Sequence, residues 1–397
     1  MFKTAQEAID YIEKQIHKSP LSAYQKILKQ HQIPTDTLKF IHVTGTNGKG
    51  STVNYLRSLL NQAGYKVGTF TSPYLISYHD RICIDKLPIS DEELLAIVNE
   101  HYEWIINEEL SKFEIDVLIM LVYFASQQVD YAIVEVGIGG RYDKTNVISS
   151  CLSLITNIGH DHIPSLGNNL EEIAFQKAGI IKENTAVITT VTQPDCLAVI
   201  KNEADLKQAQ MVICQPPLVN AYPICFEYRN MPLHLKQTAL YQVENVCLAL
   251  EALFYLKVSL TPQQIEAAIL ETNWPGRFEK LIYTGRSIYI DGAHNIDGIM
   301  ALQKTIDAFK QKEVIVIFSA LKDKDYEKMI AELEKHYTVY LTVFADERKV
   351  DLNDLKDHAH VFTSFDEALR QAMMTDQMIV VTGSLHFISE VRRKLII

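Results

Sequence analysis

The sequence predicts an α/β protein of two domains: a larger N-terminal domain with a parallel sheet and a P-loop, and a second, smaller α/β domain of Rossmann-like form. Strand patterns and helix patterns alternate along most of the chain, which is typical of a parallel sheet with helices on both faces. A glycine-rich turn follows the first strand pattern. The 397 residues fit two domains, since a domain has about 150 residues.

The N-terminal strand segments are short, apolar and rich in β-branched residues, as buried strands are. They are Lys39–Val43, Val67–Phe70, Tyr131–Val136, Ser153–Thr156 and Ala186–Thr190. The helix segments repeat apolar residues every three or four positions, for example at Val53, Leu56 and Leu59. They are Ser51–Ala63, Asp91–Asn107, Asp116–Gln127, Asn169–Ala178 and Ala239–Leu256. Residues 191–240 contain several prolines, and their pattern is less regular.

A loop near residue 275 predicts the boundary between the domains. Pro275 and Gly276 are adjacent in it, and such a pair is typical of a break between elements. The elements that follow form a second α/β unit: Ile288–Ile290, Gly298–Phe309, Val314–Phe318 and Met378–Val381. We therefore expect domains at residues 1–275 and 276–397.

The composition argues against several classes of protein. The formal net charge of -11 disfavours nucleic acid as a partner, because phosphate neutralisation needs Lys and Arg. The chain has no run of about 18 apolar residues, and its first residues lack the apolar region of a signal peptide, so we expect no membrane association. The six cysteines form no CxxC pair, which favours free thiols in a reducing compartment. We expect a cytoplasmic monomer.

The most specific single motif is His42–Thr52, HVTGTNGKGST, between a strand segment and a helix segment. A loop in this place can hold phosphate oxygens with its backbone N–H groups and the helix N-terminus. Lys49 can reach the terminal phosphates of a nucleotide, and Ser51 or Thr52 can offer a hydroxyl to a metal ion. The motif departs from GxxxxGK[ST], because a valine stands at the first glycine position and a glycine separates the lysine from the serine. We expect a site for nucleotide phosphate.

Candidate metal ligands follow two other strand segments. Glu135 ends YAIVEV, and a carboxylate there lies at the edge where parallel sheets bind ligands, although a solvated glutamate is the alternative. The His-Asp-His turn at 160–162 follows Ser153–Thr156, a segment that we expect to neighbour the Glu135 strand. Lys177 is either a surface lysine of its helix or, after carboxylation to a carbamate, a metal ligand.

These motifs resemble those of the folylpolyglutamate synthase and dihydrofolate synthase family, within the Mur ligase superfamily. The similar motifs run in family order: HVTGTNGKGS at 42–51, TSPYL at 71–75, DRI at 80–82, EVGIGGRYDKTN at 135–146, ITNIGHDH at 155–162, LGNNLEEIAFQKAGIIK at 166–182, WPGRFE at 274–279, DGAHN at 291–295 and VTGSLHFI at 381–388. The set is highly specific, although no one piece of it is. The resemblance implies a Mur-ligase-type ATP-binding (ATPase) central domain in residues 1–275 and a Mur-ligase-type C-terminal domain in residues 276–397.

The resemblance also implies roles for individual residues. The ATP-binding residues would be Thr46, Asn47, Gly48, Lys49, Gly50, Ser51, Asn245, Arg277, Asp291 and His294. The magnesium ligands would be Ser51, Ser72, Glu135, His162 and, if carbamylated, Lys177. The catalytic residues would be Lys49, Glu135, His162 and Lys177. The substrate loop would include Arg81, Gly139, Gly140 and Asp143. A monovalent cation is a further candidate ion.

The implied reaction joins L-glutamate to the γ-carboxylate of a (tetrahydro)folate, with ATP as substrate and Mg²⁺ as cofactor. The folate carboxylate attacks the γ-phosphate of ATP, which gives an acyl-phosphate and ADP. The amino group of glutamate then displaces phosphate and forms the amide of a folylpolyglutamate.

Two alternatives stay open at this point. The first is dihydrofolate synthase activity, alone or beside the main one, with dihydropteroate as the acceptor. Tyr142 and Lys144 alter the usual GGRLDATN near the expected pterin side, and Tyr74 and Tyr241 stand where histidine is common. The second alternative is a nucleotide-binding module without ligase activity, which the DGAHN segment and the second α/β unit disfavour.

Overall fold

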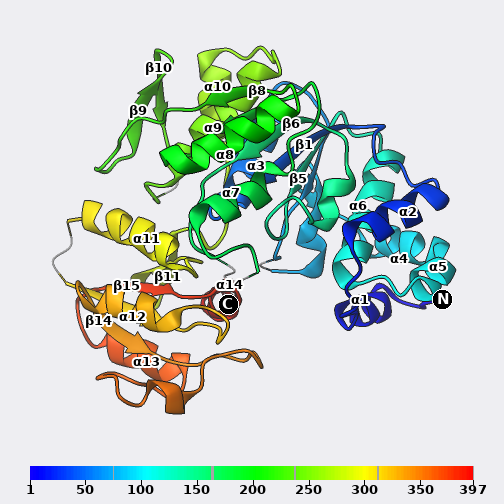
Figure 1. Cartoon of the computed structure of the whole chain (residues 1–397). Helices are drawn as coiled ribbons and strands as arrows, with labels where there is room; N and C mark the ends of the chain where they lie inside the picture. Colours follow the sequence, from blue (N-terminus) through cyan, green and yellow to red (C-terminus); the bar gives the residue numbers. More distant parts are fainter. Residues whose placement is uncertain (75, 162–164, 237, 311–312, 397) are drawn as a thin grey trace. The chain divides into compact units, whose positions relative to one another are not determined.

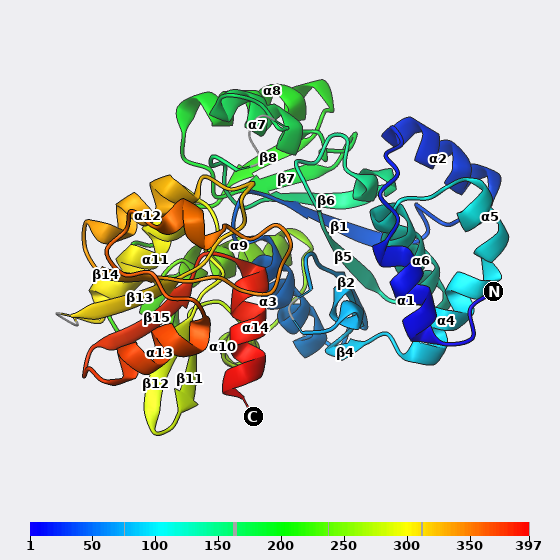
Figure 2. The ribbon, with the colours of Figure 1, turned by 90° about the horizontal axis from the view of Figure 1, so that it is seen from below.

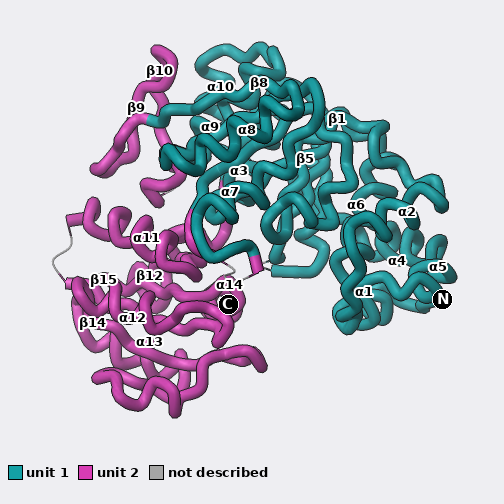
Figure 3. Tube along the Cα trace, viewed as in Figure 1, with its two compact units in different colours: residues 1–158, 166–216, 244–272 teal, residues 159–165, 217–243, 273–397 magenta. Residues whose placement is uncertain are grey.

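The chain forms two compact units, which are described separately (Figure 3). The structure, a computed structural model, describes residues 1–74, 76–161, 165–236, 238–310 and 313–396. Unit 1 contains Met1–Ile158, Leu166–Pro216 and Glu244–Thr272. Unit 2 contains Gly159–Ser165, Pro217–Val243 and Asn273–Ile397.

The centre of unit 1 is a sheet in which the described strands have the order β4-β3-β2-β5-β1-β6-β7-β8 (Figure 1). The strands are β1 Lys39–Thr44, β2 Val67–Phe70, β3 Ile82–Ile84, β4 Leu87–Pro88, β5 Tyr131–Glu135, β6 Ser150–Ile155, β7 Ala186–Thr189 and β8 Gln210–Ile213. Pairing is parallel from β2 to β8, which confirms the predicted parallel sheet. The hairpin of β3 and β4 adds an antiparallel edge beside β2.

Strand β1 lies in the middle of this sheet, between β5 and β6. The expectation that Ser153–Thr156 neighbours the Glu135 strand is therefore wrong. Strand order depends on the direction of each crossover, which is decided by tertiary packing, whereas the sequence pattern gives only the order along the chain. Since β1 has later strands on both sides, its carboxyl end is a switch point of the sheet, where such folds bind ligands.

The helices with residues in unit 1 largely follow the predicted segments. They are α1 Ala5–Glu13, α2 Leu21–Gln30, α3 Lys49–Gln62, α4 Asp91–Glu100, α5 Tyr102–Asn107, α6 Lys112–Ser126, α7 Leu170–Ala178, α8 Pro194–Leu206, α9 Gln242–Tyr255 and α10 Pro262–Glu271. The segment Asp91–Asn107 is two helices, because His101 leaves the helical conformation (φ -103°, ψ 9°). Helix α8 lies within residues 191–240, whose sequence pattern is irregular. Its Pro194 occupies the first turn of the helix, where the missing backbone N–H costs no helical hydrogen bond.

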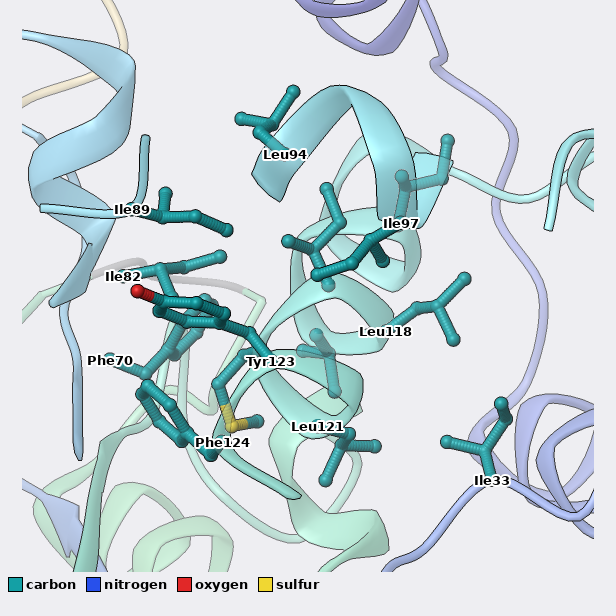
Figure 4. Close-up of a cluster of buried hydrophobic side chains, with 14 of the residues drawn as sticks. Ile33, Phe70, Ile82, Ile89, Leu94, Ile97, Leu118, Leu121, Tyr123 and Phe124 are labelled. Atoms are coloured by element: carbon teal, nitrogen blue, oxygen red, sulfur yellow. The ribbon is translucent and has the colours of Figure 1, made fainter. Parts of the chain in front are cut away.

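A large apolar cluster covers one face of the unit 1 sheet (Figure 4). Phe70 of β2 and Val134 of β5 meet side chains of α1, α2, α4 and α6 there. Helices α1, α4 and α6 also pack on one another (Figure 2). Phe124 of α6 is fully buried and lies against Gly68 of β2, where an added side chain would collide with its ring. The packing of this ring therefore depends on a glycine in the neighbouring strand.

Replacing Phe124 by alanine should lower the free energy of unfolding by about 3–5 kcal/mol, because it removes a buried ring and leaves a cavity. Urea unfolding followed by circular dichroism measures this loss. Leu87→Ala is the matched control, since Leu87 is 75% exposed, and its effect should stay within about 0.5 kcal/mol. Equal losses in the two variants would contradict the described packing.

Unit 2 is built on a sheet with the described strand order β11-β12-β15-β13-β14. Its strands are β11 Glu279–Tyr283, β12 Arg286–Ile290, β13 Val314–Phe318, β14 Thr338–Leu341 and β15 Met378–Thr382. Its helices are α11 Ile296–Ala308, α12 Tyr326–Glu334, α13 Phe365–Met373 and α14 Leu385–Leu395, and the hairpin of β9 Cys225–Tyr228 and β10 Met231–His234 also belongs to it. All pairs of the larger sheet are parallel except β11 with β12, so the second α/β unit is confirmed. No described helix is both long and apolar enough to cross a membrane.

Candidate active site

The glycine-rich motif forms the loop between β1 and α3, as predicted. The loop is attached to the end of β6: the backbone N–H groups of Thr46 and Asn47 donate to the backbone oxygen and the Oδ1 of Asn157, at 3.0 and 2.9 Å. The Thr156 hydroxyl donates to the carbonyl of Asn47 at 2.5 Å. Asn157 was missed as a site residue, although its place in ITNIGHDH directly after a strand was a usable signal.

Lys49 is the first residue of α3, and its side chain folds back over the loop. Its Nζ donates to the carbonyls of Gly45 and Thr46, both at 3.1 Å. Gly48 caps the helix with φ 85°, a conformation that favours glycine, and a Cβ there would collide with the side-chain oxygen of Asn245. Asn245 of α9 therefore lies against the loop, and its role in ATP binding stays a prediction. Gly50 and Ser51 are buried in the first turn of α3.

Glu135 and Ser72 lie together at the ends of neighbouring strands. Glu135 ends β5 in register with Val43 of β1, directly before the glycine-rich loop. Its carboxylate is buried and accepts the backbone N–H of Ser72, with Oε2 at 3.2 Å. His162 lies outside the described residues. Among the residues that are described, no group of three His, Cys, Asp or Glu side chains could hold a metal ion.

The loop 137–146 packs against the C-terminal turn of α7. The N–H of Arg141 donates to the carbonyl of Gln176 at 2.7 Å. A Cβ on Gly140 would come within 2.9 Å of that carbonyl and 3.1 Å of the carbonyl of Lys177, so the close approach requires a glycine. The Lys177 side chain is buried, at 3% exposure, which disagrees with the alternative of a surface lysine.

Asp143 gives the loop 137–146 its shape. Its carboxylate accepts the N–H of Ile138 and the N–H of Thr145, both at 2.9 Å, and the Thr145 hydroxyl at 2.5 Å. Burial raises the pKa of Asp143, and these hydrogen bonds act in the opposite direction. The carbonyl of Gly139 accepts the Thr44 hydroxyl at 2.6 Å, so the predicted substrate loop is tied to β1.

Arg81 belongs to a different network from the other predicted substrate residues. Its guanidinium is buried and lies 3.4 Å from the Asp116 carboxylate of α6. The rings of Tyr74 and Tyr78 lie 5.3 and 5.8 Å from it, within the range of cation–π attraction. The sequence pattern did not indicate this pairing, because Asp116 lies in an apolar helix.

The three candidate residues of unit 2 lie around Gly292. Asp291 is buried and accepts the Tyr241 hydroxyl at 2.6 Å and the N–H of Ala293 at 2.9 Å. His294 contacts the carbonyl of Gly292 through Nδ1 at 2.9 Å, and a Cβ on Gly292 would meet the Arg277 guanidinium. Burial raises the pKa of Asp291, and burial together with this carboxylate raises that of Tyr241 well above its usual value.

Comparison with known proteins identifies close relatives over the full length of the chain. The Mur ligase middle domain matches residues 43–253, and the Mur ligase glutamate ligase domain matches residues 276–385. The chain is 36% identical to the dihydrofolate synthase/folylpolyglutamate synthase of Bacillus subtilis, with 100% of both chains covered. It is 34% identical to the folylpolyglutamate synthase of Lacticaseibacillus casei, with 91% of each covered.

Solved structures of such enzymes have the same fold. A Mycobacterium tuberculosis folylpolyglutamate synthase complexed with ADP and AMPPCP superimposes with a TM-score of 0.88 at 26% identity, over 98% of both chains. The apo form of the L. casei enzyme gives 0.85 at 31% identity, over 99% of both. A complex of such a synthase with AMPPCP and folate gives 0.86 at 32% identity, over 98% of this chain and 99% of that one.

Proposed function

The chain belongs to the Mur ligase family, in the group of folylpolyglutamate and dihydrofolate synthases, and we propose how its residues perform the ATP-dependent ligation of L-glutamate to a folate. The observation that carries this proposal is the arrangement at the carboxyl end of the unit 1 sheet. The glycine-rich loop, the Ser72–Glu135 pair and the loop 137–146 are attached to neighbouring strands there. This arrangement can hold a nucleotide triphosphate beside a carboxylate acceptor.

The glycine-rich loop and the N-terminus of α3 would bind the phosphates of ATP. Anions are stabilised by backbone N–H groups at a helix N-terminus, and Gly48 brings the chain into that position. Lys49 would exchange its carbonyl contacts for the β- and γ-phosphates, which carry full negative charge. Ser51 would add a hydroxyl, and Asn245, against Gly48, would support the loop.

Mg²⁺ fits the donor atoms near Glu135. Ser72 and Glu135 supply oxygen atoms, the kind of ligand that Mg²⁺ prefers, and ATP phosphates would complete the coordination together with the proposed His162. When bound, the ion would neutralise charge on the β- and γ-phosphates. Glu135 is already held by the N–H of Ser72, so this carboxylate is oriented before any ion binds.

Lys177 would act as a carbamate, formed when its amine adds CO₂ and releases a proton. Its side chain is buried, at 3% exposure, and its backbone carbonyl lies close to Gly140 of the loop 137–146. The carbamate would be an oxygen donor for a second metal ion, a role that an ammonium cannot have.

The reaction would proceed in two displacements. An oxygen of the folate γ-carboxylate attacks the γ-phosphorus of ATP, the bond to the β–γ bridging oxygen breaks, and ADP leaves with that electron pair. The amino nitrogen of glutamate then attacks the carbonyl carbon of the acyl-phosphate. The carbon–oxygen bond to phosphate breaks, the amide forms, and phosphate leaves while the amine loses a proton. Lys49 would stabilise the charge that develops on the transferred phosphoryl group.

Tyr241 would orient Asp291, for which we propose a role in ATP binding together with Arg277 and His294. Tyr241→Phe should raise the KM for ATP about tenfold, because it removes a hydrogen bond to a carboxylate, worth about 1.5 kcal/mol. Steady-state kinetics with varied ATP measures the change. Tyr241→His, which keeps a donor, should stay near the wild-type KM. An unchanged KM in the phenylalanine variant would contradict the proposed role.

A panel of acceptors tests the proposed function. The purified protein is incubated with ATP, labelled glutamate and either tetrahydrofolate or dihydropteroate, and incorporation of the label is measured. We expect ATP-dependent incorporation into tetrahydrofolate, with one ADP formed per amide. Incorporation into dihydropteroate alone would replace the main function by dihydrofolate synthase activity. ATP hydrolysis at full rate without glutamate would instead favour a module without ligase activity.

Three further properties stay predictions: the need for a monovalent cation, the monomeric state and the cytoplasmic location. The domain boundary near residue 275 is also proposed. The start of the glutamate ligase domain match at residue 276 and the change of unit after Thr272 support it.

A further inference from the structure

His42 lies on β1, shortly before the glycine-rich loop that we propose binds phosphate. Its side chain is completely buried. Its Nε2 lies 2.8 Å from the hydroxyl oxygen of Thr145. That hydroxyl lies 2.5 Å from Oδ1 of Asp143, so the three side chains form a continuous chain of hydrogen bonds. None of the roles proposed above uses His42 or Thr145.

The chemistry of these three side chains determines which atoms carry the hydrogens in the two hydrogen bonds. An ionised carboxylate only accepts, so the Thr145 hydroxyl donates to Asp143. The free lone pair of the hydroxyl oxygen then accepts from His42, which requires a hydrogen on Nε2. Nδ1 is buried and has no hydrogen-bond partner among the described residues, so a second hydrogen there would be an unpaired donor. Burial lowers the pKa of His42 well below its usual value, in the same direction.

A second hydrogen bond between β1 and the loop 137–146 lies close to that of His42. Residues two apart in a strand share a face, so His42 and Thr44 point to the same side of β1. Thr44 donates to the carbonyl of Gly139, and His42 bonds to Thr145. The strand that enters the phosphate loop therefore holds the loop 137–146 near both of its ends.

Asp143 connects Thr145 to the rest of the loop 137–146 through hydrogen bonds to the backbone. It accepts the N–H groups of Ile138 and Thr145, which lie on either side of it in the chain. The next residue after Thr145, Asn146, accepts a hydrogen bond from the Lys182 ammonium at 2.9 Å and donates one to the carbonyl of Gly179 at 3.0 Å. The Thr145 hydroxyl thus joins His42 to the carboxylate that shapes the loop.

We infer that His42 is a positioning residue: as a neutral Nε2–H donor it fixes the acceptor loop 137–146 through Thr145 and Asp143, and so links the shape of that loop to the strand of the phosphate loop. This inference rests on the proposed function and on the expectation that Gly139, Gly140 and Asp143 belong to the substrate loop. Its expected consequence is selective. Loss of the link disturbs binding of the acceptor and leaves ATP binding almost unchanged.

Thr145→Val tests the link, because valine keeps the shape of threonine and removes only the hydroxyl. The KM for tetrahydrofolate should rise about tenfold, as expected for a lost hydrogen bond to a carboxylate, while the KM for ATP changes less than about twofold. Thr145→Ser keeps the hydroxyl and should retain the wild-type KM values. An unchanged acceptor KM in the valine variant, or an equal rise of both KM values, would overturn the inference.

Two His42 variants give the matching comparison on the donor side. The amide nitrogen of His42→Gln can take the place of Nε2–H and should largely preserve the acceptor KM, whereas His42→Phe keeps a ring without a donor and should behave like Thr145→Val. A higher acceptor KM in His42→Gln than in His42→Phe would contradict a donor role.

Nitrogen NMR of the wild-type protein labelled with ¹⁵N-histidine tests the tautomer directly, with His42→Gln used to assign the signal. We expect a protonated Nε2 and a bare Nδ1 throughout the pH range of activity. A protonated Nδ1 would overturn the inference whatever the kinetics show. If the wild-type protein ligates glutamate to no acceptor, the proposed function fails, and the NMR result still decides the state of His42.

Discussion

Lys49→Ala is expected to lower kcat by about a hundred- to a thousandfold, with the protein still folded. Its Nζ lies 3.1 Å from two carbonyls of the glycine-rich loop, from which it would move to the γ-phosphate when ATP binds. Removing one preorganised group that stabilises transition-state charge has an effect of this size. Initial rates with saturating ATP and tetrahydrofolate measure it.

The control for Lys49 is Lys29→Ala, on the exposed side of α2. It removes the same charge from the protein and should retain the wild-type rate. Circular dichroism of both variants should match the wild type, since neither change affects the core. A wild-type rate in the Lys49 variant would contradict the proposed role of the loop.

Lys177→Ala is expected to lower activity by about a hundredfold and to recover part of it when acetate or formate is added. The variant removes the carbamate and leaves a buried space, which a short carboxylate can enter and in which it can supply the missing oxygen ligands. Losses of up to this size are typical when a group that organises a metal site is removed. Rates are measured over a series of acetate concentrations at constant ionic strength.

The Lys49→Ala variant is the control for this rescue. Acetate should not raise its rate, because the missing group there is a cation. Full activity of the Lys177 variant without additive would contradict any role in the reaction. A loss of activity that no short carboxylate relieves would contradict the carbamate and leave the lysine itself as the required group.

Local elements were predictable where one pattern dominated. The strands Val67–Phe70 and Val314–Phe318 have the predicted bounds, because short apolar runs between turns define their own ends. Helix α8 was missed, since its proline was interpreted as part of an irregular region and lies instead in the first turn. The position of β1 between β5 and β6 was also missed, because strand order depends on contacts between distant segments.

In the candidate site, too, local features were predictable from the sequence and contacts between distant segments were not. The positions of the glycine-rich loop and of Glu135 were predictable, because both lie at the carboxyl ends of strand patterns that pair in parallel. Thr145 was missed, because it acts through a hydrogen bond to a distant strand, which a linear pattern does not contain. Asn157 was missed although its place directly after a strand was a usable signal. The close approach of Gly140 to the backbone carbonyl of Lys177 also depends on the packing of two separate segments, which the sequence pattern does not contain. The role of His162 stays a prediction.

Transfer of ¹⁸O from the acceptor to phosphate tests the chemistry most directly. Tetrahydrofolate labelled with ¹⁸O in both oxygens of its γ-carboxylate is ligated to glutamate, and the products are analysed by mass spectrometry. Attack of the carboxylate on the γ-phosphate requires one ¹⁸O in the released phosphate and one in the new amide. Phosphate without the label, formed at the same rate as the amide, would contradict an acyl-phosphate intermediate and the arrangement of the site proposed around it.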